Sequence, residues 1–141
     1  MSKRVAEFFL FDIFIAILKI ENSSKKFSTA QEILYDYQAW DTIIREFEII
    51  GEATKKLINY KILNEEKRVI VDFRNLLIHN YFGIDPEEVW DIIKNDLPQY
   101  KKEIVNLIKS IDKNLKNELI ESFIEYYKYL DFVINELEKL K

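Results

Sequence analysis

The stretch that decides the fold class is residues 33–51, ILYDYQAWDTIIREFEIIG. Its large apolar residues recur at steps of three and four, the spacing of one face of a helix. They are Ile33, Tyr37, Trp40, Ile44, Phe47 and Ile50. We predict a helical region over residues 28–59, opened by a capping box between Ser28 and Gln31 and long enough to contain a kink or short break.

The composition of the whole chain agrees with this helical pattern. The 141 residues are 48% hydrophobic and include only two glycines and two prolines, so little turn chemistry is available for a sheet with many hairpins. A chain of this length fits a single core. We therefore predict an all-α fold, with a bundle of about four to five helices over residues 1–111.

Local signals divide this bundle further. We expect a first helix over residues 3–21 and a third that begins at Asn64. The run Asp85-Pro86-Glu87-Glu88 is a strong helix start, and the fourth helix should continue to about residue 110 with a bend or pause near Pro98. Gly51 lies inside the second helical region, where glycine weakens a helix, so we expect a close contact between helices there.

The last thirty residues follow a separate pattern. Apolar residues at alternating steps of three and four predict one long amphipathic helix within residues 112–141. They are Ile120, Phe123, Tyr127, Leu130, Ile134 and Leu137, widened by Leu119, Tyr126, Val133 and Leu140. The periodicity leaves open whether this face packs on the bundle, on a second copy or on a partner.

Charge and residue usage exclude several classes of protein. The net charge of −4 argues against a protein that coats nucleic acid, so any contact with RNA must be local. Without cysteine and with one histidine, we expect no disulfide, no metal site and no cofactor, and a cytoplasmic location. Glu7, Asp12 and Lys19 interrupt the apolar residues 5–20, which therefore predict a buried helix, with no membrane span and no secretory cleavage site.

The only histidine, His79, lies in the run Arg74-Asn75-Leu76-Leu77-Ile78-His79-Asn80-Tyr81. Histidine can both give and accept a proton near neutral pH, and arginine matches phosphate oxygens. Together they could cleave a phosphodiester without a metal, and RNA suits this chemistry because its 2′-OH is an internal nucleophile. The alternative is a histidine that follows an arginine on a helix by chance.

The spacing of the two side chains poses a geometric problem. On an ideal helix Arg74 and His79 point roughly 140° apart. Either the helix ends near His79, or two chains meet and share a cleft, with Val71 and Ile78 as the apolar residues buried between them. The same helical count places a core-facing arc opposite Asp72, Asn75 and His79, with Arg74 at one edge of the arc. It consists of Val69, Ile70, Phe73, Leu76 and Leu77.

Several motifs in order carry a resemblance to a known family. They are RNLLIHNYFGID at residues 74–85, IIGEA at 49–53, VWDII at 89–93 and DLP at 96–98. In this combination, over residues 4–111, the chain resembles the HepT-like branch of the HEPN proteins. The chain differs from the family pattern at Lys67-Arg68-Val69, where members of the family frequently have a tryptophan, and in the added segment after Ile111.

The resemblance implies a HEPN-type helical bundle and a homodimer with its active site at the interface. It also implies a metal-independent ribonuclease that is the toxin of a toxin-antitoxin pair. Arg74 and His79 become the catalytic pair, with Asn75 and Glu52 in support. The implied antitoxin is a minimal nucleotidyltransferase similar to MntA, which silences the toxin by transferring AMP to Tyr81.

Other candidate residues have plainer readings. Glu48 and Glu52 could be paired carboxylates but suit a solvated face or an ion-pair edge. Trp40 and Trp90 fit apolar helical series better than base-stacking platforms, and Lys101 and Lys102 fit a solvated face better than a phosphate contact. The alternative function is a non-catalytic helical subunit that binds substrate or acts as a scaffold for a nucleotidyltransferase.

Overall fold

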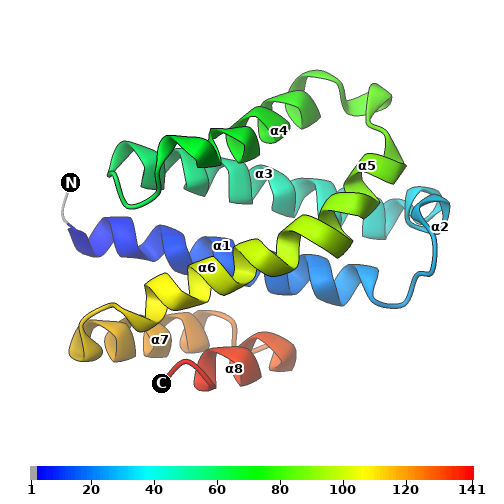
Figure 1. Ribbon diagram of the computed structural model, residues 1–141. Helices are drawn as coiled ribbons and strands as arrows, with labels where there is room; N and C mark the ends of the chain where they lie inside the picture. Colours follow the sequence, from blue (N-terminus) through cyan, green and yellow to red (C-terminus); the bar gives the residue numbers. More distant parts are fainter. Residues whose placement is uncertain (1–2) are drawn as a thin grey trace.

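The computed structural model describes residues 3–141, with all their side chains except those of residues 3–5 and 81. The described part contains helices and no strands, which confirms the all-α prediction (Figure 1). The α-helices are α1 (Lys3–Ser24), α2 (Ala30–Tyr35), α3 (Tyr37–Asn59), α4 (Arg68–His79), α5 (Pro86–Asp91), α6 (Leu97–Lys109), α7 (Lys113–Tyr126) and α8 (Asp131–Glu138). None of the helices in this part of the chain is both long and apolar enough to cross a bilayer.

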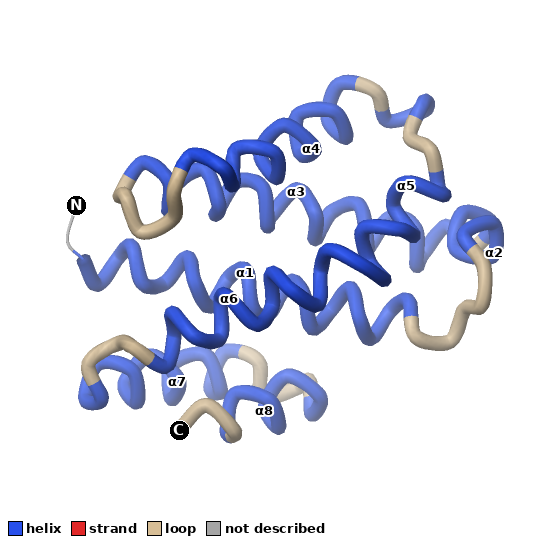
Figure 2. Tube along the Cα trace, viewed as in Figure 1, coloured by secondary structure: helices blue, strands red, loops and turns tan. Residues whose placement is uncertain are grey.

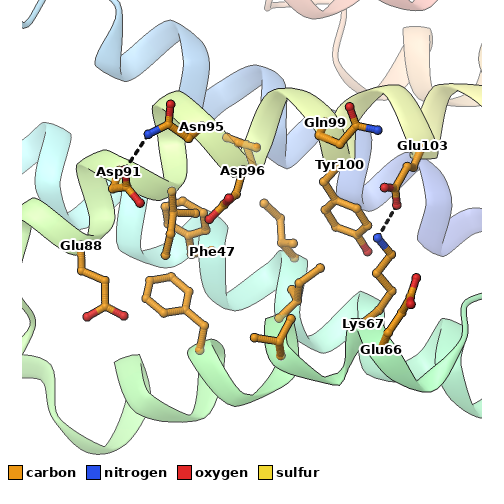
Figure 3. A pocket seen from close by; sticks show the side chains of 16 residues that line it. Phe47, Glu66, Lys67, Glu88, Asp91, Asn95, Asp96, Gln99, Tyr100 and Glu103 are labelled. Atoms are coloured by element: carbon orange, nitrogen blue, oxygen red, sulfur yellow. Dashed lines mark hydrogen bonds and ion pairs between the residues drawn. The ribbon is translucent and has the colours of Figure 1, made fainter.

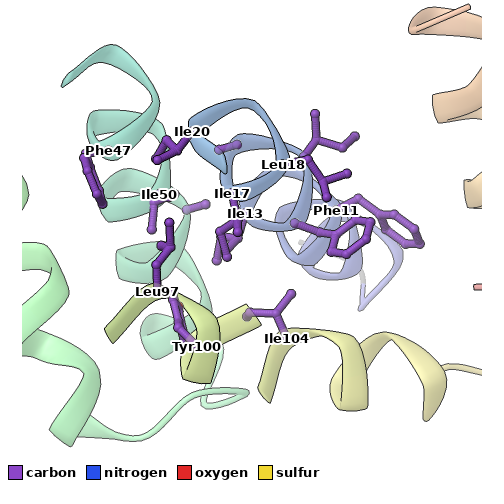
Figure 4. Close-up of a cluster of buried hydrophobic side chains, with 14 of the residues drawn as sticks. Phe11, Ile13, Ile17, Leu18, Ile20, Phe47, Ile50, Leu97, Tyr100 and Ile104 are labelled. Carbon is purple, nitrogen blue, oxygen red and sulfur yellow. The ribbon is translucent and has the colours of Figure 1, made fainter. Parts of the chain in front are cut away.

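Helix α1 lies at the centre of the molecule and is buried on most sides. It contacts α3, α6 and α8, and its isoleucines Ile13, Ile17 and Ile20 are fully buried (Figure 4). The apolar run that could suggest a membrane segment is therefore a core helix, because its side chains face other helices. Figure 1 and Figure 2 show α4 on one side of the bundle and the pair α7 and α8 on the other.

The predicted break in the second helical region falls at Asp36. This residue has an extended backbone and ends α2, and its side chain accepts a hydrogen bond from the Ala39 amide at 3.1 Å to begin α3. The capping box lies one residue later than predicted. Thr29, and not Ser28, accepts from the Glu32 amide, while the Glu32 carboxylate accepts from the amide of Ser28.

The motif helix α4 is short and stops at the histidine. Asn64 caps a 3-10 turn (Glu65–Lys67) that leads into α4, as the sequence predicts for the start of this region. At the other end, the Asn80 amide donates to the Leu76 carbonyl at 2.9 Å and the chain turns into a second 3-10 segment (Tyr81–Gly83). The first of the two predicted geometries, a helix that ends near His79, is therefore the observed one.

The core-facing arc predicted for α4 is only partly correct. Leu77 is fully buried, and Ile70 and Phe73 are half-buried, but Val69 is 67% exposed and Leu76 40% exposed. Val71, expected at a dimer contact, is buried within the chain. The difference arises because α4 packs mainly on α3, which covers only part of the predicted arc.

Helices α5 and α6 form one interrupted rod. The Asp85 side chain accepts from the Glu87 amide at 2.9 Å and Pro86 occupies the first turn, which confirms the predicted helix start. A π-helical segment (Ile92–Asp96) then joins α5 to α6. The predicted bend or pause near Pro98 is seen as this change of helix type, because a proline nitrogen cannot donate to the carbonyl four residues earlier.

The C-terminal segment is two helices, where the sequence predicts one. Residues 127–130 separate α7 from α8, and Leu130 has an extended backbone. A straight helix from Lys113 to Glu138 would be about 39 Å long, whereas the 22 residues of α1 span about 33 Å. The break lets both halves bury apolar side chains against the bundle. The sequence left open whether this segment packs on the bundle, on a second copy or on a partner, and the structure shows it packed on the bundle. The Phe123 ring stacks on Phe11 of α1 with centroids 5.1 Å apart.

Candidate functional site

The site begins with the contact between α3 and α4. Gly51 of α3 is buried, and a Cβ atom there would overlap the Cβ of Arg74 and lie 2.6 Å from its Cγ. Only glycine allows the stem of the arginine to lie this close to the α3 backbone. The close helix contact predicted at Gly51 is therefore confirmed, and its partner is the candidate catalytic arginine.

Two neighbours hold the guanidinium of Arg74. Its Nη2 lies 3.1 Å from Oε2 of Glu52, and its Nη1 donates to Oδ1 of Asn75 at 2.9 Å. The Nε atom is buried and has no hydrogen-bond partner among the described residues. Among the described residues, one N–H on each Nη atom has no further partner, so the arginine retains donors for phosphate oxygens.

The ion pair of Arg74 and Glu52 lies at the surface of the molecule, and both side chains are partly buried. The side chain of Arg74 is 28% exposed and that of Glu52 is 45% exposed. At such exposure an ion pair contributes little to stability. Its effect is on geometry, because the carboxylate limits the rotamers that the guanidinium can adopt.

His79 lies five residues further along α4, in its last turn, and its side chain is exposed. Five residues correspond to a rise of about 7.5 Å along the axis. No hydrogen bond or ion pair joins His79 to Arg74 in the described part of the chain. One chain therefore places both groups on the same short helix without bringing them into contact.

A small cavity of about 210 Å³ adjoins the guanidinium. Arg74 and Glu52 line it together with Arg45, Glu48 and Asp12. Burial raises the pKa of the Asp12 carboxyl above its ordinary value. Sequence reasoning treated Asp12 only as a charge that interrupts an apolar run. This charged residue inside an apolar run is the feature of the sequence that could have indicated the cavity, because a carboxylate on a core helix needs polar surroundings.

Tyr81, the predicted modification site, begins the 3-10 turn after α4. Its side chain lies outside the described residues. Because α4 ends at His79, Tyr81 does not continue the helix that carries Arg74. Its neighbour Phe82 is fully exposed, so the turn itself lies at the surface.

The other candidates have structural roles. Trp40 is buried, and Trp90 is half-buried beneath Lys94, whose Nζ lies 4.5 Å from the ring centroid. Lys101 pairs with Glu21 of α1 at 2.8 Å. Glu48 lies 3.5 Å from Arg45, so the Glu48 and Glu52 carboxylates each face an arginine and do not form a carboxylate pair.

A larger groove lies on another face of α4. Its volume is about 770 Å³, and it runs between α4 and the rod formed by α5 and α6, with α3 as its floor (Figure 3). Phe73 faces this groove, whereas Arg74 faces the small cavity. Sequence reasoning did not predict the groove, because its two walls come from segments about twenty residues apart whose distance only the fold sets.

Comparisons with known proteins agree with the motifs. A family profile described as "Ribonuclease HepT-like" matches residues 13–107. "Putative RNase MJ1380" of Methanocaldococcus jannaschii is 37% identical over 107 residues, which cover 74% of this chain and 97% of that protein. "Probable ribonuclease HepT" of Thermococcus cleftensis is 36% identical over 110 residues, which cover 76% and 99%.

A third relative is longer than this chain. "Gamma-glutamylcyclotransferase and putative RNase MJ0434" of Methanocaldococcus jannaschii is 35% identical over 102 residues, which cover 70% of this chain but 41% of that protein. The chain thus spans less than half the length of this relative. No solved structure matches. The profile covers more than half of the sequence, and it includes Gly51, Glu52, Arg74 and His79. The chain belongs to the HepT-like ribonuclease family of HEPN proteins.

Proposed function

We propose that this protein is a metal-independent RNA endonuclease in which Arg74 and His79 are the catalytic pair. The observation that carries the proposal is the fixed guanidinium of Arg74, oriented by Glu52 and Asn75 and still with free N–H groups. The names of the relatives, which describe ribonucleases, agree with it. The proposed roles of Asn75 and Glu52 are to hold the arginine in place.

The reaction follows from the chemistry of RNA. Neutral His79 accepts the proton of the ribose 2′-OH as the 2′-oxygen attacks phosphorus. The bond to the 5′-oxygen then breaks, and a proton passes to that oxygen from the protonated histidine. The products are a 2′,3′-cyclic phosphate and a 5′-hydroxyl. Arg74 stabilises the negative charge that develops on the phosphate oxygens during the attack.

A homodimer would place these groups in one cleft. Since Arg74 and His79 of one chain do not touch, the second chain can supply the missing partner across a two-fold axis. Leu76 and Ile78, at 40% and 42% exposed, provide apolar surface on α4 for such a contact. The sequence predicts Ile78 at this contact, and Leu76 takes the place of Val71, which is buried in the single chain. A mass in solution equal to one chain would contradict this arrangement.

The test of the catalytic pair is cleavage of RNA in EDTA by nuclease-free preparations. We expect His79→Ala to lower the rate by about 10²- to 10⁴-fold with an unchanged fold, because the side chain is exposed. Arg74→Lys should also fail, since an ammonium cannot make the planar two-point contact. Arg68→Lys is the matched control, because Arg68 pairs with Glu65 on the surface.

The outcomes separate the proposal from its alternative. Equal rates for the wild type and His79→Ala would refute the catalytic assignment. Inactive wild-type protein that still binds RNA or a nucleotidyltransferase would favour the non-catalytic subunit. Loss of activity in EDTA would contradict metal independence.

We also propose that the protein is the toxin of a toxin-antitoxin pair, silenced when an MntA-like nucleotidyltransferase transfers AMP to the hydroxyl of Tyr81. The added phosphate is negative and the added base is bulky, so the group would compete with RNA for the arginine. With ATP, magnesium and the partner, intact-protein mass spectrometry should show added AMP and RNA cleavage should stop. Tyr81→Phe should lose the added mass, whereas Tyr129→Phe, a change at an exposed tyrosine, should keep it. Full inhibition of Tyr81→Phe without added mass would mean inhibition by binding alone.

A further inference from the structure

The groove between α4 and the rod formed by α5 and α6 is open and apolar at its base. Phe47 of α3 lies on the floor, and Ile70 and Phe73 of α4 and Ile92 of the π segment are only half-buried. Val69, on the rim, is 67% exposed. A surface of this kind is costly to leave in water. The groove is therefore shaped to receive another apolar surface.

The walls of the groove are strongly acidic. Five carboxylates line it, against one lysine (Figure 3). They belong to Glu66, Glu88, Asp91, Asp96 and Glu103. The lysine, Lys67, is an ion-pair partner of Glu103 and lies 5.4 Å from the Tyr100 ring, so it neutralises only one end of the groove.

The other end carries uncompensated negative charge. Glu88, Asp91 and Asp96 are exposed there, on α5 and the π segment. Asp91 accepts a hydrogen bond from Asn95 at 2.6 Å, which does not change its charge. For Glu88 and Asp96 no cationic partner is found among the described residues. The potential over this end therefore repels phosphate and attracts cations.

We propose that this groove binds an amphipathic helix that carries lysine or arginine beside its apolar stripe, contributed by a partner protein. The floor matches the apolar stripe, and the carboxylates match the flanking cations, as in other helix-in-groove complexes. The twelve residues of α4 give the groove a wall of about 18 Å, enough for three turns of a bound helix.

The negative charge of the groove disfavours two other possible ligands, RNA and a second copy of this chain. RNA would bring phosphates to a wall of carboxylates, which is unfavourable. A second copy of this chain carries a net charge of −4, so it supplies no excess of cations. The inference is also independent of the ribonuclease assignment, because the groove and the cavity at Arg74 have no lining residue in common.

The test uses a synthetic peptide of about 14 residues with leucines at helical spacing and lysines on both flanks. Fluorescence anisotropy of the labelled peptide should show saturable binding that weakens as salt is added. The triple variant Glu88→Gln, Asp91→Asn, Asp96→Asn should bind roughly ten-fold more weakly, since each surface charge pair contributes a small factor. Val69→Lys should weaken binding too, and its exposure makes it compatible with folding.

The matched control removes three charges elsewhere. Glu121→Gln, Glu125→Gln, Glu138→Gln alters exposed residues of α7 and α8 and should leave peptide binding unchanged. RNA cleavage should be the same in both triple variants and in the wild type. A peptide with glutamates in place of the lysines should not bind.

Four results would overturn the proposal. They are no binding of the lysine peptide, equal binding of the glutamate peptide, an unchanged affinity in the groove variant, and displacement of the peptide by RNA. If the groove variant instead changed the oligomeric state of the protein, the groove would be an interface between copies, and the proposed partner would be wrong.

Discussion

Gly51 links the packing of the bundle to the chemistry of the site. The stem of Arg74 lies against the α3 backbone at this residue, and the head of the same arginine contacts Glu52, the next residue along α3. The spacing of these contacts fixes where the guanidinium lies relative to the surface. A change in the distance between α3 and α4 should therefore change both stability and activity.

We expect Gly51→Ala to lower the free energy of unfolding by about 2 kcal/mol, because the new methyl group must push α4 away from α3. The atoms it would meet are the Cβ and Cγ of Arg74, which are not the flexible end of the side chain. RNA cleavage should fall as well, since the guanidinium moves. Urea denaturation and a cleavage assay measure the two effects.

The second glycine of the chain provides the control for this change. A Cβ on Gly83 would meet nothing within 4 Å, and the backbone there has no positive φ. Gly83→Ala should therefore change stability by less than about 0.5 kcal/mol. If the two variants behaved alike, the close approach at Gly51 would have no energetic role.

At the scale of elements, the hairpin of α7 and α8 extends the core beyond the part that the family motifs cover. Phe123 of α7 stacks on Phe11 and lies 5.7 Å from the Phe8 ring, measured between centroids. Leu119, Val133 and Leu137 are fully buried in the same continuous cluster as the residues of α1. Residues 112–141 are thus part of the packed bundle, and the division of the chain after residue 111 stays a proposal based on the motifs.

We expect Phe123→Ala to destabilise the whole chain by about 2 kcal/mol, less than for a fully buried ring because Phe123 is half-buried. Thermal unfolding should remain a single transition, since the core is continuous. Tyr126→Ala, at a side chain that is 71% exposed, should change stability by less than about 0.5 kcal/mol. Two separate transitions would show that the hairpin is an independent unit.

The sequence predicts most of these elements but not how the hairpin turns. The start at Asp85 and the break before α3 carry side-chain caps that can be recognised locally. Residues 127–130 contain no glycine or proline, so the break there follows from tertiary packing on a short bundle. The same limit applies to the site: Glu52 and Arg74 could be paired from the motifs, whereas Asp12 could not, because its place depends on how α1 crosses α3.

At the scale of the molecule, α1, α3 and the hairpin enclose ionisable groups, and one of them, Glu46, weakens the fold at neutral pH. Burial raises the pKa of Glu46, although Lys19 and Arg45 act in the opposite direction. Burial also raises the pKa of Tyr127 to about 12, with Asp12 adding to the effect. The Lys19 ammonium lies 4.8 Å from the centroid of the Tyr127 ring. The charged form of Glu46 is therefore less favourable in the folded chain than in the unfolded chain.

The sign of the pH effect follows from this shift. Since the folded pKa of Glu46 is raised, the folded state holds its proton to a higher pH than the unfolded state, whose carboxyl titrates near 4.5. The contribution of this group to stability is therefore lost as the pH rises from 4.5 through the folded pKa.

Glu46→Gln has no such loss. The stability of this variant relative to the wild type should rise between pH 4.5 and pH 7, measured by urea denaturation at a series of pH values. Glu125→Gln, at an exposed carboxylate paired with Lys128, is the control and should show a flat difference. A variant at Glu46 that became less stable than the wild type as the pH rose would mean that the ionised carboxylate is stabilised by Lys19 and Arg45 more than it is penalised by burial.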